Sequence, residues 1–248
     1  MIFYNSPYPA PNPRRVRIFA AEKGIALPTR DLSIPAREHK AAEFLALNPR
    51  GQTPALQLDD GTVIAESVAI CRYLEVMHPQ PPLFGNSAAE QALIEMWDRR
   101  VEMILMPPVG AVWVHTHKFT AAIPGRNLEW GESNRPRVDD AMRFFDGALE
   151  GREFLASDSY SIADILLLTT VDFAAFVGMA MPDDLTHLQA WHARVSARPS
   201  ASARETMPYM IPRTNRHPGA GRGPARMMRS RSGVAGLVWV PACAGMTN

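Results

Sequence analysis

A proline-rich segment at residues 78–87, HPQPPLFGNS, separates two parts of the chain that have different secondary-structure patterns. Before it, short apolar runs alternate with helical periodicity. After it, strand signals disappear, and only long helical patterns remain to about residue 203. Regular elements seldom cross three prolines and a glycine within ten residues. We therefore predict an α/β domain over residues 1–80, an all-helical domain over 88–203 and a linker between them.

The first part is predicted to contain four strands and three helices in the order strand, helix, strand, helix, strand, strand, helix. The strands are expected at 2–4, near Leu32, at 55–58 and at 63–64, and the helices at 14–24, 38–48 and 67–77. Asp59-Asp60-Gly61 between the last two strands is typical of a hairpin turn, and Gly24 is placed to end the first helix. This order predicts a layer with a parallel half and a hairpin half.

The second part is predicted to be a bundle of helices. One helix begins at Ala88 and must kink or break at Pro107-Pro108. Others are expected at 135–149 and 185–198, and the almost wholly apolar stretch 161–177 predicts a buried central helix.

Composition excludes several classes of protein. The chain has 248 residues, of which 46% are hydrophobic, which is enough for a sizeable core. Residues 1–203 hold 19 basic and 24 acidic side chains, which argues against a nucleic-acid-binding surface. No apolar run approaches the ~18 residues of a membrane span, and the start does not resemble a secretory signal. Two cysteines, Cys71 and Cys243, make neither a disulfide framework nor a thiolate metal site, so we expect a cytoplasmic protein without a metal.

The last residues, 204–248, carry seven arginines and no lysine. They show no usable periodicity and resemble the translated read-through of a repeated, GC-rich intergenic element. We predict a disordered tail, and a flexible basic tail with an anchoring role remains the alternative.

Three features around the predicted hairpin indicate a site for an extended peptide ligand. Pro54 begins a strand, which predicts a cis bond after Thr53 and exposed backbone groups on Thr53. Glu66 and Ser67 stand at the start of a helix, whose free N–H groups favour a carboxylate, and Glu66 could hold an ammonium group. Together the features match a γ-glutamyl peptide, although Ser67 alone could be a simple N-cap.

Over residues 1–203 the chain resembles the cytosolic glutathione transferases. The resemblance lies in the TP…ES pairing, the hairpin DDGTVIAES and the linker into an all-helical domain. It implies a thioredoxin-like domain that binds glutathione, followed by a helical-bundle domain that contributes the electrophile pocket, and a homodimer. It assigns Thr53, Pro54, Glu66 and Ser67 to glutathione, with His39, Lys40 or Gln52 near the glycyl carboxylate. SIAD at 161–164 resembles the family's helix-capping box.

The thiol-activating residue is less conventional. APN followed by a basic helix resembles the bacterial and fungal members that lack a catalytic Tyr, Ser or Cys. We predict that Asn12, just ahead of the first helix, donates to the thiol, helped by the helix N-terminus and by the field of Arg14 and Arg15. The alternative for Asn12 is a loop residue bonded to its own backbone.

Other residues are alternatives for the same role. His115 or His117 could hold an activating water, but Gly110 stands where the resemblance expects a Ser. We do not expect these histidines to form a metal pair, because positions i and i+2 do not face the same way on a helix. Ser6 lies early in the loop, and Tyr8 is flanked by prolines.

The resemblance predicts a transferase that conjugates reduced glutathione, as co-substrate and without another cofactor, to small hydrophobic electrophiles. Met103, Met106, Trp113 and Phe119 could line the electrophile pocket, or simply pack the kinked helix. Two other functions stay open: a glutathione-dependent peroxidase or disulfide reductase, and a non-catalytic binding module on the same fold.

Overall fold

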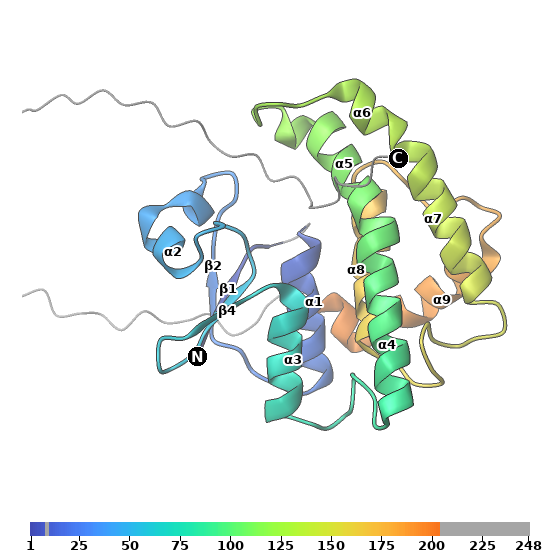
Figure 1. Ribbon diagram of the computed structural model, residues 1–248, viewed down its shortest axis with the longest axis horizontal. Helices are drawn as coiled ribbons and strands as arrows, with labels where there is room; N and C mark the ends of the chain where they lie inside the picture. The colour runs from blue at the N-terminus through green and yellow to red at the C-terminus, as the bar shows by residue number, and fades with distance from the viewer. Residues whose placement is uncertain (8–9, 204–248) are drawn as a thin grey trace, which may run out of the picture. The chain divides into compact units, whose positions relative to one another are not determined.

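The computed structural model describes residues 1–7 and 10–203, and a four-stranded sheet lies in its first part (Figure 1). The strands lie in the order β2-β1-β3-β4. β1 pairs in parallel with β2, whereas β3 is antiparallel to both β1 and β4. The parallel half and the hairpin half are therefore present as predicted. The strands are β1 (Ile2–Asn5), β2 (Thr29–Asp31), β3 (Ala55–Gln57) and β4 (Val63–Ala65).

The helices of this part begin and end differently from the prediction at two places. The first, α1 (Pro11–Glu22), begins three residues earlier than predicted, because a first helical turn tolerates prolines that lack an N–H donor. The predicted single helix over 38–48 is wrong: Ala41 is extended, with φ −67° and ψ 146°. It separates a short 3-10 helix, η1 (Glu38–Lys40), from α2 (Ala42–Leu47). The hairpin is followed by α3 (Ser67–Met77).

The remainder of the described chain is helical, as predicted. Before Pro107 and Pro108 the long first helix changes into a π-helical turn, and the two prolines then occupy the first turn of the next helix. The widened turn suits prolines, which cannot supply the i→i−4 hydrogen bond. The elements are α4 (Ala88–Arg100), η2 (Val101–Leu105), α5 (Met106–Thr116), η3 (Lys118–Thr120), α6 (Leu128–Ser133), α7 (Arg135–Ala148), α8 (Ile162–Phe176), α9 (Thr186–Ser196) and η4 (Pro199–Ser202).

One hydrophobic core joins the sheet to the helices. Neighbouring strand residues point to opposite faces of a sheet. Phe3 therefore packs with α1, α3 and the helical part, whereas Tyr4 packs under Phe44 of α2. The predicted central helix is α8, whose side chains are almost all buried and which packs against α1, α4, α5 and α9. Its N-terminus carries the predicted capping box of Ser161 and Asp164.

No helix within residues 1–7 and 10–203 is both long enough and apolar enough to cross a membrane. The predicted tail at 204–248 lies outside the described residues.

Candidate active site

The strand β3 begins next to the loop that follows β1. The bond between Thr53 and Pro54 is cis, as predicted. The Thr53 hydroxyl lies 2.8 Å from the Oγ atom of Ser6, the first residue after β1. Ser6 is completely buried. The backbone of Thr53 is thus held beside the loop that leads into α1.

The N-terminus of α3 is open to an anion. Glu66 precedes it with a φ of +69°, and its side chain is 72% exposed, 3.9 Å from Arg50. Ser67 is the first helical residue rather than the N-cap, and its Oγ atom receives a 3.5 Å hydrogen bond from Arg15. Within the described residues, no side chain caps this helix. Its first N–H groups and positive dipole end can therefore take a carboxylate.

Arg15 lies beside this helix end, where it donates to Ser67, and the predicted contribution of its field to the thiol stays a prediction. Its buried guanidinium donates to the hydroxyls of Thr169 and Thr170 on α8, at 3.3 and 3.2 Å. Burial lowers the pKa of Arg15, and the carboxylates of Glu102 and Asp98 partly offset that effect. The cation lies next to Ser67, where the predicted γ-glutamyl carboxylate would bind.

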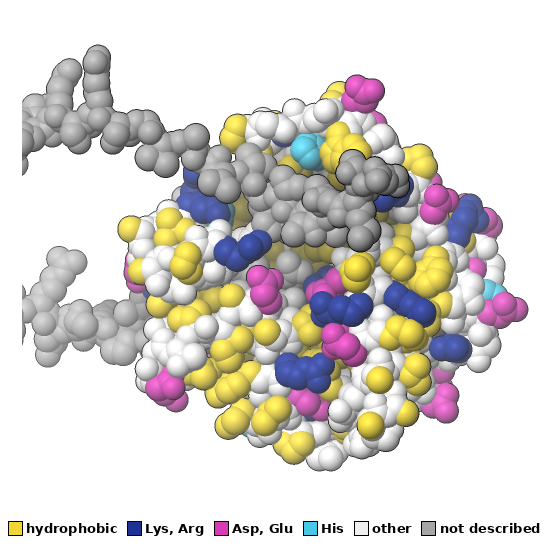
Figure 2. Space-filling view, in the orientation of Figure 1, with side chains coloured by type: hydrophobic (Ala, Val, Ile, Leu, Met, Phe, Trp, Pro, Cys, Tyr) yellow, Lys and Arg dark blue, Asp and Glu magenta, His cyan; other side chains and the backbone are white. Residues whose placement is uncertain are grey.

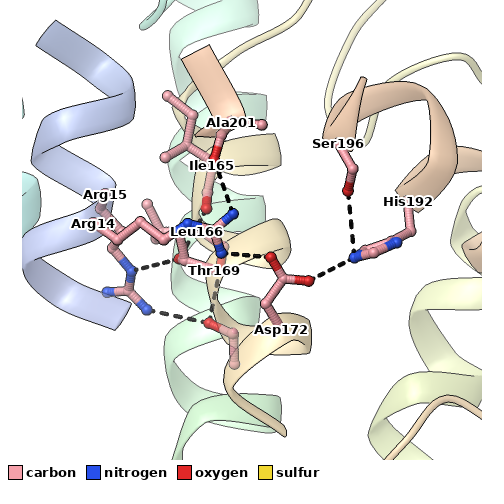
Figure 3. Close-up of polar contacts among 10 residues, drawn as sticks. Arg14, Arg15, Ile165, Leu166, Thr169, Asp172, His192, Ser196 and Ala201 are labelled. Atoms are coloured by element: carbon pink, nitrogen blue, oxygen red, sulfur yellow. Dashed lines mark hydrogen bonds and ion pairs between the residues drawn. The ribbon is translucent and has the colours of Figure 1, made fainter. Parts of the chain in front are cut away.

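Arg14 is held by partners in the helical part of the chain. It pairs with Asp172 of α8 and donates to the carbonyl oxygen of Ala201 at 3.1 Å (Figure 3). The Oδ1 atom of Asp172 lies 2.6 Å from Nε2 of His192, and the Ser196 hydroxyl lies 3.5 Å from that same nitrogen. A Ser-His-Asp triad needs its acid and its nucleophile on opposite ring nitrogens. The cluster therefore joins α1 to α8 and α9 and does not form a charge relay.

The three residues predicted near the glycyl carboxylate lie around one turn. A Cβ atom at Gly51 would come within 2.7 Å of the His39 carbonyl oxygen and 2.9 Å of the Lys40 amine, so only glycine fits. The Lys40 amine donates to the Arg50 carbonyl oxygen, and the Arg50 side chain donates to Gln52, each over 3.0 Å. Burial, together with Lys40 and Arg37, lowers the pKa of His39. His39 is therefore neutral near pH 7, and Lys40 supplies the positive charge.

Asn12 is the second residue of α1 and does not precede the helix, which corrects its predicted position. Its Oδ1 atom is buried and has no hydrogen-bond partner among the residues that the structure describes. The alternative interpretation, in which Asn12 is a loop residue, is also wrong, because Asn12 lies within α1. Ser6 is too deeply buried to touch a ligand, and Tyr8 lies outside the described residues.

An aromatic cluster forms where α5 ends against α8. Trp113 lies 5.4 Å from Phe173 and 5.8 Å from Phe176, between ring centroids. His117 lies 4.6 Å from Trp113 and 4.9 Å from Phe119, which is 67% exposed. The structure thus brings two of the predicted pocket residues, Trp113 and Phe119, into one cluster. Phe173 follows Asp172 on α8, and Asp172 pairs with Arg14 of α1.

The other predicted pocket residues and His115 lie elsewhere. Met106 lies two turns before Trp113 on the same helix. Met103 is 66% exposed and lines a different groove of about 400 Å³ with Ile104 and Phe144. The ring of His115 accepts a 3.0 Å hydrogen bond from the backbone of Asn127, just before α6.

Reasoning from the sequence missed Phe173, Phe176 and Asp172, all on α8. Within an otherwise apolar helix, Thr169, Thr170 and Asp172 were the available signal, since buried polar residues need partners. Among the described residues, no group of three or more His, Cys, Asp or Glu side chains is placed to hold a metal ion. Cys71 is buried, and burial raises the pKa of its thiol.

Comparison with known proteins agrees with this arrangement. Residues 10–77 match the family model of the glutathione S-transferase N-terminal domain, and residues 113–199 match that of the C-terminal domain. Glutathione S-transferase 2 of Saccharomyces cerevisiae is 38% identical over 210 residues, which cover 81% of this chain and 87% of the relative.

Two solved structures are similar over the same region. The crystal structure of Gtt2 from Saccharomyces cerevisiae has a TM-score of 0.76 and 37% identity, and it covers 81% of this chain and 98% of its own. A glutathione S-transferase domain-containing protein of Marinobacter aquaeolei VT8 has the same TM-score and identity, covering 81% and 99%. The predicted fold, a thioredoxin-like domain followed by a helical-bundle domain, is confirmed.

Proposed function

This chain belongs to the glutathione S-transferase family, and from that premise we propose that it conjugates reduced glutathione to small hydrophobic electrophiles. Glutathione is the co-substrate, no other cofactor takes part, and the role is cytoplasmic detoxification. One observation carries the proposal: two hydrogen bonds connect the parts of the site next to the start of α1. Ser6 bonds to Thr53, and Arg15 bonds to Ser67. The backbone clamp and the open end of α3 therefore lie beside the same helix.

Glutathione is held along this edge at three points. The backbone of Thr53 pairs with the cysteinyl unit, and the N-terminus of α3 with Ser67 takes the γ-glutamyl carboxylate, with the buried Arg15 cation next to Ser67. The exposed carboxylate of Glu66 holds the ammonium group. At the other end, Lys40 and Gln52 take the glycyl carboxylate, with the neutral His39 beside them.

The protein then has to stabilise a thiolate. A thiol with a pKa near ~8.5 is only a few per cent ionised at neutral pH. Lowering that pKa by ~1.5 units requires about 2 kcal/mol. The helix N-terminus supplies ~0.3–1 kcal/mol, and a hydrogen bond from Asn12 to the charged sulfur supplies ~1.5–3 kcal/mol. The thiolate attacks the electrophilic carbon, a carbon–sulfur bond forms, the leaving group departs with its electron pair, and the thiol proton passes to solvent.

The aromatic cluster of α5 and α8 supports an apolar, planar electrophile. Phe173 and Phe176 are stacked at 16°, and Trp113 meets Phe173 edge-on. Such rings offer a large apolar surface with little conformational freedom to lose. His117 contributes a polar edge to this wall.

The groove at Met103, Ile104 and Phe144 supports a homodimer. These three apolar side chains are exposed, and the flanking Arg137 and Asp140 offer charges of both signs to a second copy. Sedimentation of the wild-type protein and of Phe144→Glu tests this point, and we expect a dimer and a monomer, respectively. A monomeric wild type would contradict it.

The experiment that tests the function combines binding with turnover. Glu66→Ala should weaken glutathione binding at least tenfold in calorimetry, whereas Glu129→Ala, an exposed carboxylate of α6, should not change it. The wild type is then assayed with a chloronitrobenzene, a peroxide and a mixed disulfide. Turnover of the chloronitrobenzene alone supports the transferase. Turnover of only the peroxide or the disulfide indicates the peroxidase or reductase, and glutathione binding without turnover indicates a binding module.

A further inference from the structure

We propose that Ser6 is a positioning residue for the thiol end of the glutathione site, acting through the hydroxyl of Thr53. The inference rests on the proposed function, because it assumes that glutathione binds along the Thr53 backbone. Ser6 itself does not touch the substrate.

The contact between the two hydroxyls is buried on the side of Ser6 and half-buried on the side of Thr53. The Oγ atom of Ser6 and the Oγ1 atom of Thr53 lie 2.8 Å apart, and Ser6 is 0% exposed. Either hydroxyl can donate to the other. If the buried Ser6 hydroxyl lost Thr53, it would be left unsatisfied, which makes this hydrogen bond costly to break. The pair is therefore a fixed link between the end of β1 and the start of β3.

The backbone of Ser6 is held as firmly as its side chain. Its carbonyl oxygen receives a 3.2 Å hydrogen bond from Arg17 of α1, and the same guanidinium nitrogen donates to the side chain of Asn5. Arg17 is 2% exposed, and its Nε atom donates to the Ala203 carbonyl oxygen at the end of the helical domain. Ser6 thus has a fixed position, from which its hydroxyl locates Thr53.

This position matters because the thiol has to lie close to two parts of the site at the same time. Ser6 belongs to the part that leads into α1, and Thr53 belongs to the backbone clamp. Ser6 directly follows β1 and leads toward Pro11 and Asn12, where the thiolate is stabilised. Thr53 carries the backbone clamp for the cysteinyl unit. The hydroxyl bridge sets the spacing between clamp and helix end. Its loss should misplace the sulfur relative to Asn12, while the carboxylate contacts at Lys40 and at the end of α3 remain.

The test compares two substitutions at one position. Thr53→Val keeps the shape of the side chain and removes its hydroxyl, whereas Thr53→Ser keeps the hydroxyl. Ser6→Ala and the double variant Ser6→Ala/Thr53→Val complete a double-mutant cycle. Three quantities are measured: the thiolate absorbance of bound glutathione against pH, kcat with a chloronitrobenzene, and the Kd of S-methylglutathione, which has no ionisable thiol.

We expect Thr53→Val and Ser6→Ala each to lower kcat, and the thiolate fraction of bound glutathione at pH 6.5, about three- to tenfold, which is the range for one hydrogen bond. The double variant should be no worse than the poorer single variant. Thr53→Ser, which keeps the hydroxyl, should recover most of the kcat and the thiolate fraction that Thr53→Val loses, and the Kd of S-methylglutathione should change less than twofold.

Two results would overturn the inference while leaving the proposed function intact. One is a Thr53→Val variant with wild-type kcat and thiolate titration. The other is a loss of S-methylglutathione affinity in parallel with kcat, which would make the bridge a general support of the site. A wild-type protein that does not bind glutathione would overturn the proposed function and, with it, the inference. Circular dichroism of each variant confirms that it folds.

Discussion

Glu22 of α1 and Arg198, which follows α9, form a two-pronged ion pair in which the guanidinium donates to both carboxylate oxygens, at 2.8 and 2.7 Å. Ser200 donates to the same carboxylate. Burial alone would raise the pKa of Glu22, but the hydrogen bonds from Arg198 and Ser200 outweigh it and leave that pKa below its ordinary value. The pair joins the first helix of the glutathione-binding domain to the end of the helical domain.

The first prediction concerns this pair. Arg198→Lys removes one of the two hydrogen bonds to Glu22, because an ammonium group cannot match both oxygens of a carboxylate. It should lower the free energy of unfolding by about 1–2 kcal/mol in urea at pH 7. Arg143→Lys is the control: its pair with Asp184 is exposed on both sides, so we expect no measurable change in the free energy of unfolding.

The same pair predicts a pH dependence. The pKa of Glu22 is lower in the folded than in the unfolded state. The contribution of Glu22 to the free energy of unfolding is therefore complete above the unfolded pKa, which is near ~4.3. It is lost as the pH falls through the folded value. The difference in the free energy of unfolding between the wild type and Arg198→Lys should therefore shrink below about pH 4. A difference that stays constant to pH 3 would contradict this account.

The second prediction concerns Asp98, which is buried on α4 with neither carboxylate oxygen hydrogen-bonded within the described residues. Burial, reinforced by Glu95 and Glu102, raises its pKa well above the ordinary value. The folded state therefore binds this proton more tightly than the unfolded state, and Asp98 lowers stability as the pH rises above ~4. Asp98→Asn should gain stability over the wild type between pH 5 and pH 8.

Urea unfolding at both pH values measures this gain. Glu129 is an exposed carboxylate and serves as the control. The free energy of unfolding of Glu129→Gln should differ from that of the wild type by the same amount at pH 5 and at pH 8. If Asp98→Asn also gave a pH-independent difference, Asp98 would be ionised in the folded protein throughout this range.

The third prediction separates two candidates for the thiol donor. Asn12→Ala should raise the pKa of bound glutathione by roughly one unit or more, since the lost charged hydrogen bond is worth ~1.5–3 kcal/mol. His115→Ala should change it less, because the His115 ring is engaged by the backbone of Asn127. Thiolate absorbance against pH measures both variants. A larger shift for His115→Ala would assign the role to a water held by the histidine.

The fourth prediction concerns the size of the electrophile. Gly110 lies on the same face of α5 as Met106 and Trp113, because positions three and four apart share a helix face. A Cβ atom there would meet no atom within 4 Å. Gly110→Val should therefore narrow the space beside the aromatic cluster and lower kcat/KM for a bulky aromatic electrophile several-fold more than for a small one.

Gly147 of α7 is the matched control, since a Cβ atom there also meets nothing within 4 Å. Gly147→Val changes the same residue type in a helix away from the cluster and should leave the ratio of the two kcat/KM values unchanged. If Gly110→Val kept the wild-type ratio of the two kcat/KM values, this face of α5 would not line the electrophile site.

Features set by neighbours along the chain could be predicted from the sequence. The Asp59-Asp60-Gly61 turn, the cis bond before Pro54 and the capping box of Ser161 and Asp164 were all predicted and are all present. Each depends on the conformational limits of a few adjacent residues. The apolar run that became α8 is a further case, since a helix that is hydrophobic on all sides has to be buried.

The tertiary structure alone decided where the polar side chains of the site point. Arg14 and Arg15 are adjacent in α1, yet one pairs with Asp172 and the other reaches Thr169, 154 residues further along the chain. Ser6 meets Thr53 across 47 residues. No local pattern encodes such pairs, because a buried donor takes whichever partner the packing of other elements brings within reach. The sequence by itself therefore determined the fold and the outline of the proposed glutathione site, and the packing of α1 against α8 decided the electrostatics of that region.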